Sequence, residues 1–184
     1  LKGIPELDID PNQVYVAGLS SGGAFAMSIG CIAPDVFAGM ASAAAPSVGS
    51  SADDLSSTRG NNHSDIAKTC RSSAGNQKER FSDQMAVFLH ADDDPLVTPA
   101  YAPLNVKAMA EIYGLDGNTG KQKKTKDGSE VNYANRAISL VIDDVGHAWA
   151  GGPNASGAFV EESGINYALY LGQFFTKNNA RVKH

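Results

Sequence analysis

A pentapeptide of the form Gly-x-Ser-x-Gly, Gly18-Leu19-Ser20-Ser21-Gly22, most constrains how this chain can fold. It follows a β-branched and aromatic run at residues 14–18 and precedes small apolar residues, 24–29, that favour a helix. A strand, a sharp turn and a helix in this order form a nucleophile elbow, which lifts the serine above the sheet edge. The turn requires small residues two before and two after the serine, and Gly18 and Gly22 satisfy this. The alternative is a Gly- and Ser-rich turn without a catalytic role.

The composition limits the class of protein. A chain of 184 residues is long enough for one domain with a sizeable core, so we predict a single domain over residues 1–184. The net charge of −5 argues against a nucleic-acid-binding surface and does not suggest a membrane-binding one. No apolar run approaches the ~20 residues that cross a bilayer.

Apolar runs alternate with helical patterns, which predicts an α/β fold with a mostly parallel sheet covered on both faces. The alanines of 36–45 leave a helix open as an alternative there. The lysine-rich segment 117–130 is most simply a solvated loop. We expect strands at 14–18, 36–45, 85–90 and 137–143, and helices at 21–33, 65–71, 101–113 and 166–176.

A long polar segment, 47–82, interrupts this alternation. It is too long for a plain connection, so we predict a cap-like or lid-like insertion. Cys31 and Cys70 lie on either side of its most irregular part. They could form a disulfide that restrains the long loop, which we favour, or remain two buried thiols.

The carboxyl ends of parallel strands meet at one edge of a sheet, which here would bring Ser20, the acidic turn Asp92–Asp94 and His147 together. A serine hydroxyl needs a neighbouring base to act as a nucleophile, and the base needs a carboxylate to fix its tautomer. His147 would be the base, and the acidic turn would supply the carboxylate. Alternatively, the acidic residues form an ordinary turn and His147 is an ordinary loop histidine. We expect His90, at the end of a strand, to be a packed residue beside the site.

Three blocks of sequence carry a family resemblance: Gly18–Ala24, Pro34–Ala38 and Gly146–Gly152. They resemble the polyhydroxybutyrate (PHB) depolymerase family of esterases, which is similar to feruloyl and acetylxylan esterases. The resemblance implies an α/β-hydrolase-type three-layer fold. Ala150 stands where the family usually has proline, a departure that we do not expect to affect the chemistry.

The same resemblance singles out one aspartate. The family's acid follows a strand as His-Gly-x-x-Asp-x-x-Val, and residues 90–97 fit this spacing with Asp94 as the acid, although Ala91 replaces the glycine. The resemblance also implies that Trp149 lines the substrate cleft beside His147. A purely packing role for Trp149 is the alternative.

Compared with the complete hydrolase fold, this chain would hold only the C-terminal half, from the elbow strand onward. The N–H of Ser21 would supply one donor of the oxyanion hole, whereas the second donor normally comes from a loop before the elbow strand. An open edge on strand 14–18 would expose unpaired backbone groups, which favour pairing with other chains and aggregation. We therefore expect a second chain segment or a dimer mate to cover it.

These observations predict a serine carboxylic-ester hydrolase that cleaves poly(3-hydroxybutyrate) or its oligomers through Ser20, His147 and Asp94. The alternatives are a feruloyl or acetylxylan esterase, and a catalytically incomplete chain that binds a polymer or a protein. We expect no cofactor and no metal site, because the acidic cluster lacks matching His or Cys residues. The cysteine pair and the resemblance favour an extracellular or periplasmic location.

Overall fold

The computed structural model describes residues 8–162 and 164–182, so the ends of the predicted domain 1–184 lie outside the described residues. Short 3-10 helices, Ala52–Asp54 and Gly75–Asp83, flank the second α-helix. The strands and α-helices are, in chain order, β1 (Tyr15–Leu19), α1 (Ser21–Ile32), β2 (Gly39–Ala43), α2 (His63–Ser73), β3 (Met85–Ala91), α3 (Tyr101–Ile112), β4 (Lys121–Thr125), β5 (Gly128–Tyr133), β6 (Ala137–Ile142), β7 (Trp149–Ala150), β8 (Val160–Glu161) and α4 (Tyr167–Asn178).

The main sheet has the strand order β1-β2-β3-β6-β5-β4. The first four of these strands pair in parallel, and β5 and β4 pair antiparallel. Leu19 lies beside Ala43, and Ala43 lies beside Leu89, so the carboxyl ends of β1, β2 and β3 are level. The predicted α/β fold with a mostly parallel sheet is therefore confirmed.

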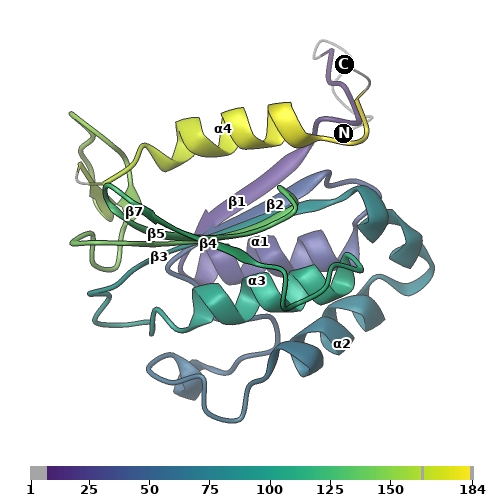
Figure 1. Cartoon of the computed structure of the whole chain (residues 1–184), viewed down its shortest axis with the longest axis horizontal. Helices are drawn as coiled ribbons and strands as arrows, with labels where there is room; N and C mark the ends of the chain where they lie inside the picture. The colour runs from purple at the N-terminus through teal and green to yellow at the C-terminus, as the bar shows by residue number, and fades with distance from the viewer. Residues whose placement is uncertain (1–7, 163, 183–184) are drawn as a thin grey trace.

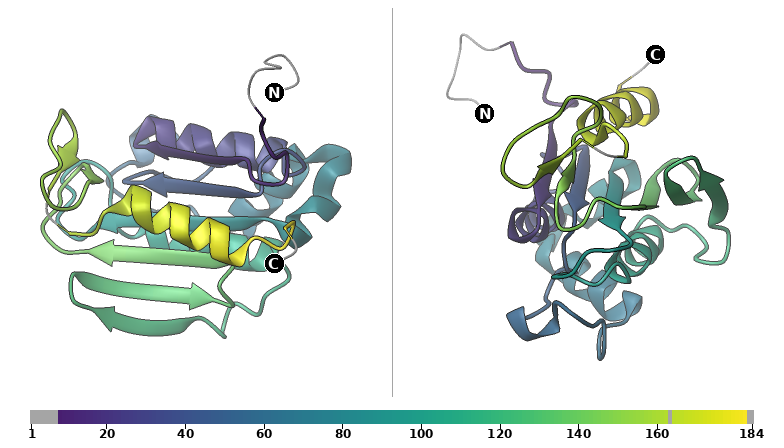
Figure 2. Two further views of the ribbon diagram at one scale, coloured as in Figure 1. Left: turned by 90° about the horizontal axis from the view of Figure 1, so that it is seen from above. Right: turned by 90° about the vertical axis from the view of Figure 1, so that its left-hand side faces the viewer.

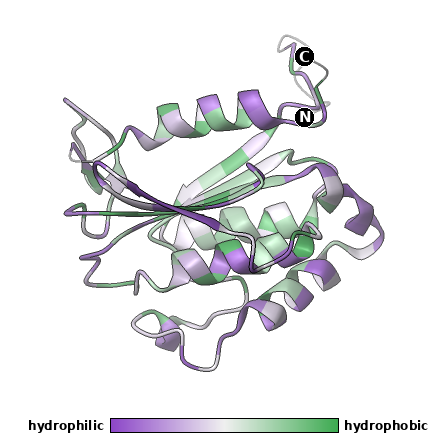
Figure 3. Cartoon of the chain, in the orientation of Figure 1, coloured by the Kyte–Doolittle hydropathy of each residue, from purple (hydrophilic) through white to green (hydrophobic). Residues whose placement is uncertain are grey.

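Helices cover both faces of the sheet. Figure 1 shows α4 on one face, α1 and α3 on the other, and α2 beyond α1 and α3. Every residue of β2 and β3 is buried, as expected for strands covered on both sides. One core cluster packs between the sheet and α1, α2 and α3, and another packs between the sheet and α4. Figure 3 shows hydrophobic residues along these inner elements and hydrophilic residues on much of α2.

The secondary structure predicted for the lysine-rich segment was wrong. Segment 117–130, predicted as a solvated loop, contains β4 and the start of β5, which form an antiparallel hairpin. All five residues of β4 are exposed, so the strand has no alternation of apolar and polar residues from which it could be recognised. Its lysines lie on a sheet edge, where charged side chains discourage pairing with another chain.

The polar segment 47–82 lies on the α1 and α3 side of the molecule. Its first part borders the chain that follows β3: Thr98 N donates to Leu55 O at 2.8 Å, and the Tyr101 hydroxyl donates to Asp54 O at 2.9 Å. Its second part forms α2, which packs on α1 and α3. A cap or lid function for this segment remains a prediction.

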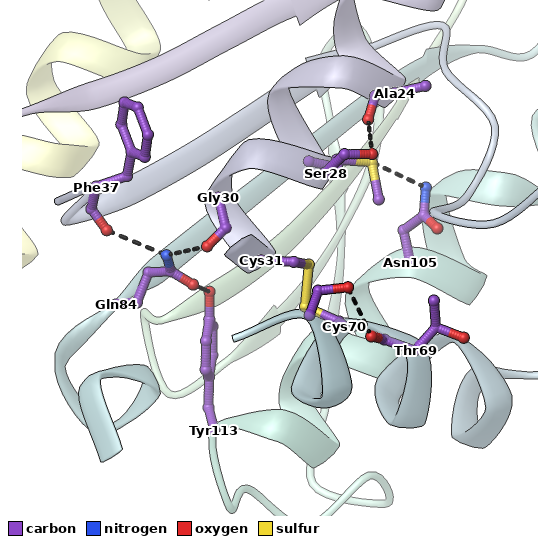
Figure 4. Close-up of a disulfide and its surroundings, with 12 residues drawn as sticks. Ala24, Ser28, Gly30, Cys31, Phe37, Thr69, Cys70, Gln84, Asn105 and Tyr113 are labelled. Atoms are coloured by element: carbon purple, nitrogen blue, oxygen red, sulfur yellow. Dashed lines mark hydrogen bonds between the residues drawn. A yellow bond between two sulfur atoms is a disulfide. The ribbon is translucent and has the colours of Figure 1, made fainter. Parts of the chain in front are cut away.

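A disulfide joins Cys31 at the end of α1 to Cys70 on α2, as the favoured alternative predicted (Figure 4). Both cysteines are buried. The bond therefore fastens the polar segment to the helix that follows the elbow. Among the described residues, no helix is long and apolar enough to cross a membrane.

Candidate active site

Ser20 occupies a sharp turn between β1 and α1. Its backbone has φ 55° and ψ −123°, a conformation that a residue with a side chain rarely adopts. Its N–H donates to Ala43 O at 2.9 Å, which ties the turn to the end of β2. These features are those of the predicted nucleophile elbow.

The elbow depends on close approach of backbone segments, although not at both predicted glycines. A Cβ on Gly18 would lie 2.2 Å from the Gly22 carbonyl oxygen, and a Cβ on Gly23 would lie 2.8 Å from the Ala45 Cβ. A Cβ on Gly22 would meet nothing within 4 Å. The expectation that Gly22 must be small to avoid a side-chain collision is therefore wrong. Gly23 is the crowded residue on the helix side of the turn.

The ends of three parallel strands bring Ser20, Asp94 and His147 into one chain of hydrogen bonds. Ser20 follows β1, Asp94 follows β3, and His147 follows β6. The His147 Nε2 atom lies 2.9 Å from the Ser20 Oγ, and its Nδ1 atom lies 2.9 Å from Asp94 Oδ2 and 3.1 Å from Oδ1. Figure 2 shows that the parallel strands point the same way, so the strand ends that carry these loops lie at the same end of the sheet. If Nδ1 carries the proton, it donates a hydrogen bond to the carboxylate, and Nε2 is free to accept the serine proton.

The Asp94 side chain is fully buried and held by several donors. Its Oδ1 accepts the N–H of Leu96 at 2.9 Å and that of Val97 at 3.0 Å. Burial alone raises the pKa of this carboxyl, but the hydrogen bonds that it accepts outweigh burial and hold its pKa well below the usual range. The groups that lower it are the His90 ring N–H, 3.5 Å from Oδ2, and the hydrogen-bond donors Val97 N–H, His147 and Leu96 N–H. The carboxylate is thus ionised at neutral pH and can stabilise an imidazolium.

The other two aspartates of the acidic turn contact the loop that carries His147. Asp93 Oδ1 accepts the N–H of Gly146 at 2.8 Å, and Asp92 Oδ1 accepts that of Asp144 at a longer 3.4 Å. The Asp92 N–H also donates to Ile142 O at 2.8 Å, which extends the pairing of β3 with β6. Sequence reasoning treated Asp92 and Asp93 only as rejected candidates for the acid, and it missed these contacts.

The remaining candidates lie around this chain of hydrogen bonds. Ser21 is the first residue of α1, where a backbone N–H has no acceptor within the helix and can serve an oxyanion. Trp149 lies in β7, half-buried, with its ring 4.9 Å from that of Tyr167. Sequence reasoning missed Tyr167, which is fully buried and whose hydroxyl donates to Ser42 O and Val87 O. A substrate-binding role for Trp149 remains a prediction.

The described residues contain no cluster of three or more His, Cys, Asp or Glu side chains that could hold a metal ion. The groups that the structure brings together here are a hydroxyl, an imidazole, a carboxylate and backbone N–H groups. Together these groups can activate a nucleophile and transfer its proton.

Comparisons with known proteins agree with the motif-based resemblance. A poly(3-hydroxybutyrate) depolymerase of Ralstonia pickettii is 35% identical in an alignment 184 positions long, which covers 95% of this chain and 37% of that protein. The chain thus spans little more than a third of this curated relative. No profile of a known protein family matches the chain.

Two solved structures share the fold. An acetyl xylan esterase from Aspergillus awamori superposes with a TM-score of 0.64 at 16% identity, covering 78% of this chain and 57% of that one. A PHB depolymerase from Penicillium funiculosum superposes with a TM-score of 0.57 at 16% identity, covering 84% of this chain and 48% of that one. At such low identity, these two likenesses establish the fold alone.

Proposed function

We propose that this chain, a homologue of a poly(3-hydroxybutyrate) depolymerase over 95% of its length, carries the catalytic residues of a serine carboxylic-ester hydrolase. The observation that carries the proposal is the continuous hydrogen-bond chain from Ser20 Oγ through His147 to Asp94, with a 2.9 Å step on each side of the imidazole. Asp94 lies 53 positions and Ser20 lies 127 positions before His147 in the sequence, so only the fold brings the three residues together.

The roles follow from the atoms. Ser20 Oγ attacks the ester carbonyl while His147 Nε2 takes its proton, and the same imidazole then protonates the departing alcohol. Asp94 stabilises the imidazolium formed in each step. The N–H of Ser21 donates to the oxyanion of the tetrahedral intermediate. Water, activated by His147, then releases the acid from the acyl-enzyme and restores Ser20.

The substrate that we propose is poly(3-hydroxybutyrate) or its oligomers. The support is the 35% identity to the Ralstonia pickettii depolymerase, together with the fit of residues 90–97 and 146–152 to the family's motifs except at Ala91 and Ala150. We propose an extracellular or periplasmic location, supported by the buried Cys31–Cys70 disulfide, because such bonds persist in oxidising compartments.

Hydrolysis of p-nitrophenyl butyrate by the wild-type chain and by Ser20→Ala tests the catalytic part of the proposal. We expect activity in the wild type and a loss of several orders of magnitude, roughly 10⁴-fold or more, in the variant. The control is Ser28→Ala in the helix that follows Ser20, where the Ser28 hydroxyl donates to Ala24 O in the preceding turn. A wild-type chain that folds but does not hydrolyse the ester would favour the reading of a catalytically incomplete, binding chain.

Substrate choice is tested separately. Turnover of PHB granules, methyl ferulate and acetylated xylan is compared at equal enzyme concentration. We expect granule hydrolysis with poor turnover of the two plant-wall esters. The reverse ranking would favour a feruloyl or acetylxylan esterase.

We further propose that another polypeptide segment or a second copy of the chain covers the free edge of β1. Among the described residues, β1 pairs only with β2, and its middle residue, Ala17, is exposed. An unpaired row of backbone donors and acceptors at such an edge is a site for strand pairing.

A further inference from the structure

His90 is a buried histidine beside the proposed catalytic residues that the mechanism above does not use. It lies at the carboxyl end of β3, only 1% exposed, on the same face of the strand as the core residue Phe88. A buried imidazole is costly unless its N–H finds an acceptor. Its position therefore requires an explanation.

Within the described part of the chain, the polar contacts observed for His90 involve its Nε2 atom. Its Nε2 lies 3.0 Å from the Val97 carbonyl oxygen and 3.5 Å from Asp94 Oδ2. A carbonyl oxygen and a carboxylate oxygen only accept, so Nε2 must carry the proton. The N–H donates mainly to Val97 O. It also lies close enough to Oδ2 for electrostatic attraction between the N–H dipole and the negative carboxylate.

These contacts bear on the orientation of the Asp94 carboxylate. Oδ2, the oxygen near His90, is also the oxygen closer to His147 Nδ1, at 2.9 Å. Oδ1 accepts the Val97 N–H, and His90 holds the carbonyl of the same Val97. His90 therefore acts on both oxygens, directly on Oδ2 and through Val97 on Oδ1.

We propose that His90 is a positioning residue that fixes the Asp94 carboxylate with Oδ2 directed at His147 Nδ1. It acts through Asp94 and does not touch the substrate. The kinetic consequence rests on the proposed hydrolase function, whereas the orientation of the carboxylate does not.

Two amide substitutions separate positioning from core packing. In His90→Gln the amide nitrogen can reach the place of Nε2, whereas in His90→Asn it reaches only the place of Nδ1. We expect His90→Asn to lower kcat for p-nitrophenyl butyrate about 10- to 100-fold with little change in KM, as for lost outer partners of active-site groups. His90→Gln should retain most of kcat. Phe88→Leu, a core change on the same face of β3, should leave kcat within about threefold of wild type after correction for the folded fraction.

A double-mutant cycle tests whether His90 works through Asp94. In an Asp94→Asn background, His90→Asn should cause little further loss of kcat, because the group that it positions has lost its charge. Independent, multiplicative losses would overturn the proposal. A folded His90→Gln variant that loses as much kcat as His90→Asn would do the same.

A readout without substrate keeps the two proposals distinguishable. The ¹³C NMR signal of the Asp94 carboxyl is followed against pH in the wild type, His90→Gln and His90→Asn. We expect the titration midpoint to move upward in His90→Asn and to stay near the wild-type value in His90→Gln. A wild type that hydrolyses no ester would defeat the proposed function while this titration still decides the role of His90, and an unchanged midpoint in His90→Asn would overturn that role.

Discussion

Ser20 holds a strained backbone conformation that its neighbours must support. A residue with a side chain at φ 55° and ψ −123° costs on the order of 1–3 kcal/mol. The Ser20 N–H bond to Ala43 and the close packing of Gly18 and Gly23 hold the turn in place. The conformation of the elbow therefore depends on these neighbouring contacts as well as on Ser20 itself.

Gly18→Ala and Gly22→Ala form a matched pair that tests this packing. The first would place a Cβ 2.2 Å from a backbone oxygen, so we expect the free energy of unfolding to fall by about 1–3 kcal/mol or more. The second enters open space at the start of a helix, so we expect no loss and a gain of up to about 1 kcal/mol. Urea denaturation measures both changes. Equal destabilisation by the two variants would contradict the crowded-turn explanation.

The sequence predicted some site residues more directly than others. Ser20 and His147 could be found because each follows an apolar run at a recognisable motif. Asp94 could not be separated from Asp92 and Asp93 by composition, and the choice required the family's spacing. The contact of His90 with Asp94 and that of Asp93 with Gly146 could not be foreseen, because they depend on the conformation of the turns after β3 and β6.

Two neighbouring strands, β3 and β6, and the loops that follow them position two of the proposed catalytic groups, Asp94 and His147. After β3 and β6 end, their pairing is continued by Asp92 N–H to Ile142 O, by Asp93 to Gly146 N–H and by Asp94 to His147. The acidic turn thus contacts the histidine loop at successive points. We expect this arrangement to limit movement of His147 relative to Ser20.

Asp93→Ala and Asp93→Asn test the contact nearest His147. The asparagine keeps an oxygen that can accept the Gly146 N–H, whereas alanine removes it. We expect Asp93→Ala to lower ester hydrolysis about tenfold, because small misplacements of a catalytic group are costly, and Asp93→Asn to retain most of the rate. The free energy of unfolding of Asp93→Ala should fall by only about 1 kcal/mol, since the hydrogen bond between Asp93 and the Gly146 N–H is exposed. Steady-state kinetics of ester hydrolysis measure these rates. Similar rates for both variants and the wild type would exclude a positioning role for Asp93.

The secondary structure was predicted best for strands whose side chains are buried on both faces of the sheet. The runs at 85–90 and 137–143 are apolar because β3 and β6 lie inside the sheet, and they were found at nearly their observed bounds. Segment 36–45 was also correctly identified as a strand, although β2 covers only Gly39–Ala43. The β4–β5 hairpin was missed because β4, which pairs with β5, is exposed throughout and buries no side chain. Such a strand leaves almost no hydrophobic pattern in a sequence.

At the scale of the whole molecule, the Cys31–Cys70 bond connects the sheet's helical layer to the polar segment. It closes a loop across 39 positions, for which the chain-entropy estimate gives about 4 kcal/mol of stabilisation. We expect the double variant Cys31→Ala, Cys70→Ala to lose about 2–4 kcal/mol in chemical denaturation. Wild-type protein under reducing conditions should lose a similar amount. A loss below about 0.5 kcal/mol in both experiments would show that packing of α2 on α1 and α3 suffices without the bond.

A helix without charged residues, α1, packs beside the edge strand β1. Helix α1 contains no charged residue, and Phe25 and Ile32 on it are 65% and 56% exposed. Val36, just beyond the helix, is 37% exposed. Figure 3 shows α1 coloured from white to green, in contrast to the hydrophilic stretches of α2. An apolar helix face beside an unpaired strand edge is a combination that favours association.

Self-association of this chain should therefore occur and should depend on that surface. We expect sedimentation velocity to show dimers or larger species that increase with concentration, because burying Phe25 and the β1 edge removes apolar area and unpaired backbone groups from water. Phe25→Lys should shift the distribution toward monomer. Leu169→Lys is the matched control, since Leu169 is 58% exposed but lies on α4, across the sheet. If the wild type is a monodisperse monomer at every concentration and hydrolyses esters fully, no second copy is needed to cover the β1 edge. An equal effect of the two lysine variants would instead point to general charge repulsion, and would remove α1 as the specific contact.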